Sequence, residues 1–121
     1  MSDKKNASID QARQLLADIP SEALAVVERL GEVRELLDAA LNEAMAEATL
    51  GGASIRSVAV RAGLSPNSVP PRLARTSQLS SYSEPDGKVS GSSIERARYD
   101  SEIGRPPPKA PLTFKPRRST S

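Results

Sequence analysis

The apolar residues of this chain are concentrated toward its N-terminus. Residues 2–75 contain 20 Ile, Leu, Val, Met and Phe residues, whereas residues 76–121 contain six. A chain becomes ordered only where apolar burial offsets the loss of backbone entropy. We therefore expect the core within the first 75 residues, followed by a weakly supported extension and a disordered tail.

The strongest periodic signal predicts one long helix over residues 21–50. Ser21 is the candidate N-cap, and Gly51-Gly52 would end the helix because glycine adopts the left-handed conformation without a steric penalty. Apolar residues step by four and three positions, as in a heptad seam. The seam comprises Val26, Leu30, Val33, Leu37, Ala40 and Ala44, and it is widened by Leu24, Val27, Leu41 and Met45.

Two compatible interpretations of this broad apolar face stay open. The helix packs within the chain's own core, or it forms a homodimer interface through residues 21–50. Its opposite face is acidic and would repel DNA, so we expect this helix to lie away from any nucleic acid. The acidic residues are Glu28, Glu32, Glu35, Asp38, Glu43 and Glu47.

A shorter helix is predicted before it, over residues 8–19, with residues 1–7 flexible. Ser8 and Gln11 form a capping box, in which each side chain satisfies a free backbone N–H of the other. The apolar residues that follow have helical spacing.

The segment 53–76 predicts a short helix, a tight turn and a second helix. Ser54 is the candidate cap of the first helix, and Gly63 permits positive φ at the turn. Ser65 would cap the second helix, with Pro66 at its first position, where the missing N–H costs nothing.

The stretch "SIRSVAVRAGLSPNSV" resembles the helix-turn-helix of bacterial repressors. The most similar pattern is "T-I-x-D-V-A-x-x-A-G-V-S-x-x-T-V-S" of the lactose-repressor-like family. The resemblance covers residues 54–74 only, and nothing resembles that family's effector domain. The matching positions are Ser54, Ile55, Val58, Ala59, Ala62, Gly63, Leu64, Ser65, Ser68 and Val69.

The resemblance implies that the second helix enters the major groove of DNA. By position, Pro66, Asn67 and Pro71 would face the bases, and Ser65 and Ser68 would lie near the backbone. Among the base-facing residues only Asn67 has a hydrogen-bonding side chain, and asparagine can pair bidentately with adenine.

Pro70 and Pro71 interrupt this second helix. Each lacks an N–H and clashes with the preceding turn, and a proline disfavours the helical region for the residue before it. We expect the backbone of Val69 outside the helical region. The recognition helix would then be one turn long, and a further helix would start at Pro71 or Arg72.

Charge is polarised along the chain. Residues 1–50 contain five Lys/Arg and ten Asp/Glu, whereas residues 51–121 contain twelve Lys/Arg and five Asp/Glu. The acid-free stretch 51–76 coincides with the motif and favours an anionic partner. The residues expected to contact double-stranded DNA are Arg56, Arg61, Ser65, Asn67, Ser68, Arg72, Arg75 and Lys88.

The extension over 77–104 predicts a loop and a short helix. Leu79 and Tyr82 would cover the edge of the core. A turn at Asp86-Gly87 and a short strand over 88–91 would make a wing-like hairpin, although no partner strand is evident. A capping box over 92–95 would start a helix that ends near Ile103.

The stretch 105–121 contains five prolines, five basic residues and no acids, and predicts a disordered tail. Three roles stay open for it: a solubility tail, a non-specific phosphate binder and a proline-rich ligand.

Enzyme chemistry finds no support in the sequence. The chain has no cysteine and no histidine, no phosphate-binding glycine loop and no metal-ligand cluster, so we expect no catalytic residues, cofactor or metal. It has no signal-peptide pattern and no apolar run of membrane-spanning length, so we expect a cytoplasmic, nucleoid-associated protein without a membrane or small-molecule partner.

The sequence as a whole predicts an all-α protein: a small helical domain with a helix-turn-helix. The leading hypothesis is a dimeric bacterial DNA-binding protein, either a transcription regulator or a plasmid, phage or chromosome maintenance factor. The alternative is an adapter protein that binds a protein partner through the acidic long helix, with the helix-turn-helix as a scaffold.

Overall fold

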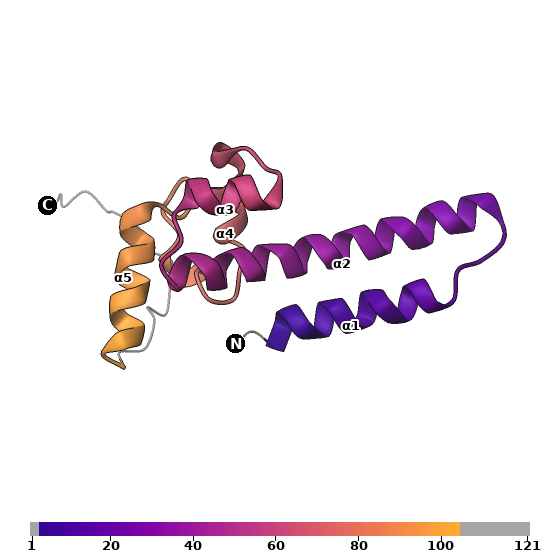
Figure 1. Ribbon diagram of the computed structural model, residues 1–121, viewed down its shortest axis with the longest axis horizontal. Coiled ribbons are helices and arrows are strands. Elements are labelled where there is room, and N and C mark those ends of the chain that lie inside the picture. The colour runs from indigo at the N-terminus through magenta and orange to yellow at the C-terminus, as the bar shows by residue number, and fades with distance from the viewer. Residues whose placement is uncertain (1–2, 105–121) are drawn as a thin grey trace, which may run out of the picture.

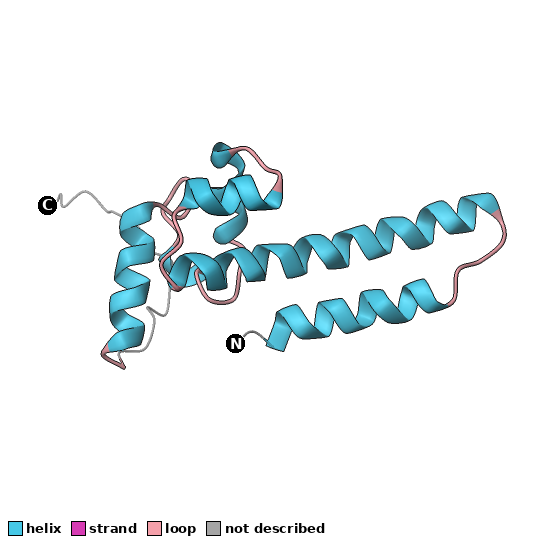
Figure 2. Cartoon of the chain, viewed as in Figure 1, coloured by secondary structure: helices cyan, strands magenta, loops and turns pink. Residues whose placement is uncertain are grey.

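The computed structural model of the chain describes residues 3–104, and these contain helices and turns but no strand (Figures 1 and 2). The predicted all-α class is therefore confirmed for this part of the chain. The expected tail at 105–121 lies outside the described residues. In order, the elements are α1 (Asp3–Ala17), α2 (Ala23–Leu50), α3 (Ile55–Ala62), the 3-10 helix η1 (Pro66–Ser68), α4 (Val69–Leu73), the 3-10 helix η2 (Ser80–Tyr82) and α5 (Gly91–Glu102).

Helices α1 and α2 run antiparallel and form a hairpin that projects from the shorter elements (Figure 1). Ala12 of α1 and Val33 and Ala40 of α2 are buried. The Arg29 guanidinium of α2 donates hydrogen bonds to backbone carbonyls at the end of α1, those of Leu15 (3.0 Å) and of Asp18. These bonds satisfy carbonyl groups that a helix C-terminus leaves without partners.

Both hairpin helices begin at residues other than those predicted. Helix α1 starts at Asp3, so residues 3–7 are helical rather than flexible and Ser8 lies inside the helix. An ion pair between Lys5 Nζ and Glu47 Oε1, at 2.8 Å, ties this first turn to α2. Helix α2 is capped by Glu22, whose carboxylate accepts from the Ala25 N–H at 2.9 Å, and not by Ser21.

The hydrophobic core lies at the C-terminal end of α2, where all the shorter elements meet (Figure 1). Much of this core comes from residues 77–104, the extension for which the sequence predicted little apolar support. Leu79 and Tyr82 are buried as predicted, and helix α5 docks through Ile94 and Ala97. The buried core residues are Met45, Ala46, Val58, Ala59, Val69, Leu73, Leu79, Tyr82, Val89, Ile94 and Ala97.

The expected wing-like hairpin is not formed by the described residues. A tight turn is present, closed by the Glu84 N–H donating to the Lys88 carbonyl at 2.8 Å, with Gly87 at φ 79°. The residue after it, Val89, is fully buried and donates its N–H to the Pro70 carbonyl at 3.1 Å. The segment therefore packs on α4 and does not pair with a strand.

Helix α5 begins slightly earlier than its predicted capping box. Ser90 is the N-cap, and its hydroxyl oxygen accepts from the Ser93 N–H at 3.2 Å. The carboxylate of Glu84 also accepts from the hydroxyl groups of Ser90, at 2.5 Å, and Ser93, at 3.1 Å. This network joins the 84–88 turn to the start of α5.

Candidate nucleic-acid interface

The first helix of the candidate site, α3, forms as the sequence predicts. The Ser54 hydroxyl oxygen accepts from the Ser57 N–H at 3.0 Å, and Val58 and Ala59 are buried against the core. Gly63 ends the helix at φ 75°, and the Leu64 N–H donates to the Ala59 carbonyl at 2.9 Å. The left-handed glycine reverses the chain, as the motif requires.

The outward face of α3 is basic and free of acids. Arg56 and Arg61 are exposed, together with Ser57 between them. Val60 lies on the same helix with 71% of its surface exposed, although it is apolar. Arginine guanidinium and serine hydroxyl groups are typical phosphate ligands, so this face suits a nucleic-acid backbone.

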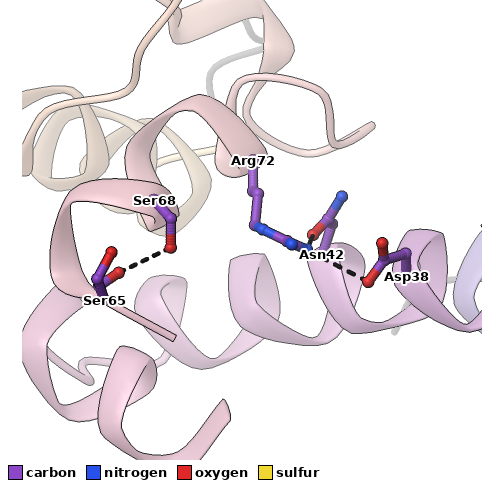
Figure 3. A network of polar contacts seen from close by, with 5 residues as sticks. All are labelled: Asp38, Asn42, Ser65, Ser68 and Arg72. Carbon is purple, nitrogen blue, oxygen red and sulfur yellow. Dashed lines mark hydrogen bonds and ion pairs between the residues drawn. The ribbon is translucent and has the colours of Figure 1, made fainter. Parts of the chain in front are cut away.

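The turn leads into η1, a single 3-10 turn that contacts α3. Ser65 adopts the extended backbone of an N-cap, but its side chain makes no capping bond. Instead Ser68 donates both its N–H, at 3.1 Å, and its hydroxyl, at 2.8 Å, to the Ser65 carbonyl (Figure 3). Pro66 and Asn67 are exposed, which leaves the Asn67 amide accessible to a ligand.

The second helix is divided into a single turn and a further helix, as predicted, but the division lies before the prolines and not at them. Helix α4 begins at Val69, before the prolines, and Pro70 and Pro71 occupy its first turn, where missing N–H groups cost nothing. Val69 itself is helical, at φ −75° and ψ −46°, so its predicted exclusion from that region is wrong. Its N–H donates to the Pro66 carbonyl, and its side chain is fully buried; these gains outweigh the pre-proline preference.

Arg72 is directed toward α2 and not toward solvent. Its Nη1 donates to Asn42 Oδ1 at 3.1 Å and lies 3.4 Å from Asp38 Oδ1 (Figure 3). Only 24% of the Arg72 side chain is exposed. The guanidinium group that the sequence predicts to contact phosphate is thus bonded to α2 in this structure.

The acidic helix lies beside the second half of the motif. A cavity of about 390 Å³ is lined by residues of α4 and of the middle of α2. Acidic residues of α2 therefore lie beside α4, and the expectation that this helix lies away from bound DNA stays a prediction. The cavity is lined by Glu35, Asp38, Ala39, Asn42, Ser68, Pro71, Arg72 and Arg75.

The other residues expected to contact DNA lie on several elements of the structure. Arg75 is exposed at the edge of the cavity beside α2, and Lys88 is exposed on the 84–88 turn. Of the acids assigned to the outer face, Glu43 is instead buried, and its carboxylate accepts from the Ser77 N–H and hydroxyl, both at 2.9 Å. Arg56, Arg61, Ser65 and Asn67 are thus exposed on α3 and the segment that follows it, whereas Arg72 is bonded to α2.

The sequence reasoning missed four residues that shape this site. Asp38 and Asn42 both bond Arg72. They are four residues apart and so share one face of α2, which is the sequence feature that indicates a common partner. Ser57 and Val60 extend the exposed face of α3. Val60 has no sequence signal, because an apolar residue in a short helix is normally assigned to the core.

No protein-family model, curated protein or solved structure matches this chain. Within residues 3–104, no helix combines the length and apolarity needed to cross a membrane. The same residues contain no group of three acidic side chains placed to hold a metal ion.

Proposed function

We propose that this protein binds double-stranded DNA through α3, the 63–65 turn and η1, used as a helix-turn-helix. The observation that carries the proposal is that Arg56, Arg61, Ser65 and Asn67 are all exposed on α3 and on the segment that follows it, a stretch that contains no acid. Neutralising phosphates with arginine releases counterions from DNA and supplies most non-specific affinity. The resemblance of residues 54–74 to bacterial repressors supports the same assignment.

Base reading in this proposal is limited to a short segment. Only one 3-10 turn projects the Asn67 amide, while Ser68, Pro71 and Arg72 line the cavity facing α2. Phosphate contacts therefore dominate the affinity, and Asn67 provides a preference for adenine. Arg75 and Lys88 add contacts at the edges of the bound duplex.

In this account the protein is a dimeric regulator of transcription or a plasmid, phage or chromosome maintenance factor associated with the nucleoid. A second copy binds along α2, within residues 21–50. Two copies provide two DNA-contacting units, which raises affinity for paired half-sites.

Selection of bound sequences from a random duplex pool tests the assignment. Asn67→Ala should abolish the preference at one position, with a cost of about 1–3 kcal/mol for the preferred sequence. Arg61→Ala should weaken binding to all sequences equally. Arg96→Ala, at an exposed position on α5, is the control and should leave both unchanged. Selection of the same sequences by wild type and Asn67→Ala would contradict base reading by η1.

The bond between Arg72 and Asp38 favours a second candidate function, that of an adapter. It holds Arg72 against α2, where Glu28, Glu32 and Glu35 are exposed to solvent. In this alternative the α3–α4 unit is a scaffold and α2 binds a basic protein partner. Absence of duplex binding at low salt, with partner capture that is lost in Glu28→Lys, would favour the adapter.

A further inference from the structure

The broad apolar stripe of α2 divides into two faces in the structure. Val33 and Ala40 are buried, with α1 packed along this helix. Leu30 and Leu37, which belong to the same predicted seam, are 47% and 46% exposed. The stripe is therefore wider than α1 can cover.

The uncovered part has its own heptad spacing. Beginning at Val27, its successive apolar residues are three, seven, four, three and four positions apart. Arg34 lies within the seven-residue step. Such spacing suits helix-to-helix packing with a 3.5-residue repeat. From first to last it extends about 32 Å along the helix. This outward seam comprises Val27, Leu30, Leu37, Leu41, Ala44 and Ala48.

The outward seam has an exposed end and a recessed end. At its N-terminal end, Val27 and the neighbouring Leu24 have 65% and 74% of their surfaces exposed. At its C-terminal end, the seam opens into a mainly apolar groove of about 410 Å³ between α2 and α3. The groove is lined by Leu41, Ala44, Met45, Ala48, Ala53, Ser57, Val58, Arg61 and Ala62.

We propose that a second copy of this chain covers the outward seam, with the two α2 helices antiparallel. Leu24 and Val27 of each copy then enter the groove of the other, and Leu37 lies near the two-fold axis. A two-fold pair uses the same surface twice, so one projecting end and one groove on each chain are sufficient to form it. This pairing deepens the dimer part of the proposed function, and its geometry involves no DNA.

Charge favours the antiparallel direction. Residues 18–38 contain six acids and two arginines, whereas residues 51–76 contain four arginines and no acid. An antiparallel pair brings the acidic end of one hairpin beside the acid-free segment 51–76 of its partner. A parallel pair would place Arg34 opposite Arg34 and align the acidic ends, and like charges in contact disfavour a complex.

Sedimentation equilibrium of the full chain tests the pairing without DNA. Wild type should be dimeric, and Val27→Asp or Leu37→Asp should shift it to monomer, because each places a charge in the apolar seam. Val60→Asp is the matched control, since Val60 is equally exposed but outside the groove, and it should stay dimeric. Circular dichroism of each variant verifies its helix content. A monomeric wild type overturns the proposal, even if it still binds duplex, and so does dimeric Val27→Asp.

Cysteine cross-linking tests the direction, and the chain contains no native cysteine that would interfere. A disulfide requires Cα atoms within about 7 Å. Leu37→Cys should cross-link to itself, and Val27→Cys should cross-link to Ala48→Cys in a mixture of the two chains. Self-cross-linking of Val27→Cys as the dominant product indicates a parallel pair and overturns the proposal.

Discussion

The Nη1 atom of Arg72 lies 3.4 Å from Oδ1 of Asp38, although the two residues are 34 positions apart in the sequence. This ion pair joins α4 to the long helix and turns a motif arginine toward the interior of the chain. It separates the motif into an accessible part, α3 and η1, and a part that supports the fold.

Arg72→Ala should affect stability more than DNA binding. Loss of a partly exposed ion pair and of its bond to Asn42 should lower the free energy of unfolding by about 0.5–1.5 kcal/mol. Duplex affinity should fall less than in Arg61→Ala. Urea denaturation and fluorescence anisotropy measure the two quantities. A larger loss of affinity in Arg72→Ala than in Arg61→Ala would show that Arg72 leaves Asp38 to bind phosphate.

Asp38→Asn should strengthen duplex binding. The change removes a negative charge beside Arg72 and Arg75 and leaves Arg72 with its bond to Asn42 but without its ion pair, so its charge is available to a phosphate. One added phosphate contact makes the dependence of log affinity on log salt steeper by about 0.9. Glu28→Gln, on the same helix but remote from α4 in sequence, provides the control. Unchanged affinity and slope in Asp38→Asn would argue against an electrostatic effect of α2 on binding.

Gly63→Ala should destabilise the protein through backbone strain alone. Gly63 has φ 75°, and a Cβ atom there would meet nothing within 4 Å. The expected cost is about 1–2 kcal/mol. Gly31→Ala is the matched control: Gly31 is exposed within α2, its Cβ would also meet nothing, and alanine there should add about 0.5–1 kcal/mol. Thermal unfolding shifts of the same sign for both variants would contradict this account.

Tyr82→Phe should weaken the docking of α5. The Tyr82 hydroxyl donates to Asp100 Oδ2 at 2.8 Å, and both residues are buried. Removing a donor to a buried carboxylate costs about 1–3 kcal/mol. Hydrogen exchange should show faster exchange of α5 amides than in wild type. Equal exchange rates would mean that the apolar contacts of Ile94 and Ala97 are sufficient to hold the helix.

The sequence was most informative where structure depends on near neighbours. Ser54 caps α3 and Gly63 takes positive φ as predicted, because both roles depend on the backbone within a few residues. A division of the second helix was also predicted, but it lies before Val69 and not at the Pro-Pro step. Burial of Val69 in the core outweighed the local preference of a residue that precedes proline.

The remaining features depend on contacts between distant segments. The first turn of α1 is supported by Lys5 and Glu47, which are 42 residues apart, and no pattern near Lys5 indicates this pair. The direction of Arg72 depends in the same way on α2. The division of the α2 stripe into covered and exposed faces was not predictable either, since periodicity does not show how much of a face a neighbour covers.

The most direct test of DNA binding by this surface is the affinity for a random duplex, measured by fluorescence anisotropy across a series of salt concentrations. Wild type should bind with a linear dependence of log affinity on log salt. Arg56→Ala and Arg61→Ala should each reduce the steepness by about one, while the control Arg96→Ala retains the wild-type value. Absence of binding at about 50 mM salt, or identical steepness in all four proteins, would contradict the proposed interface.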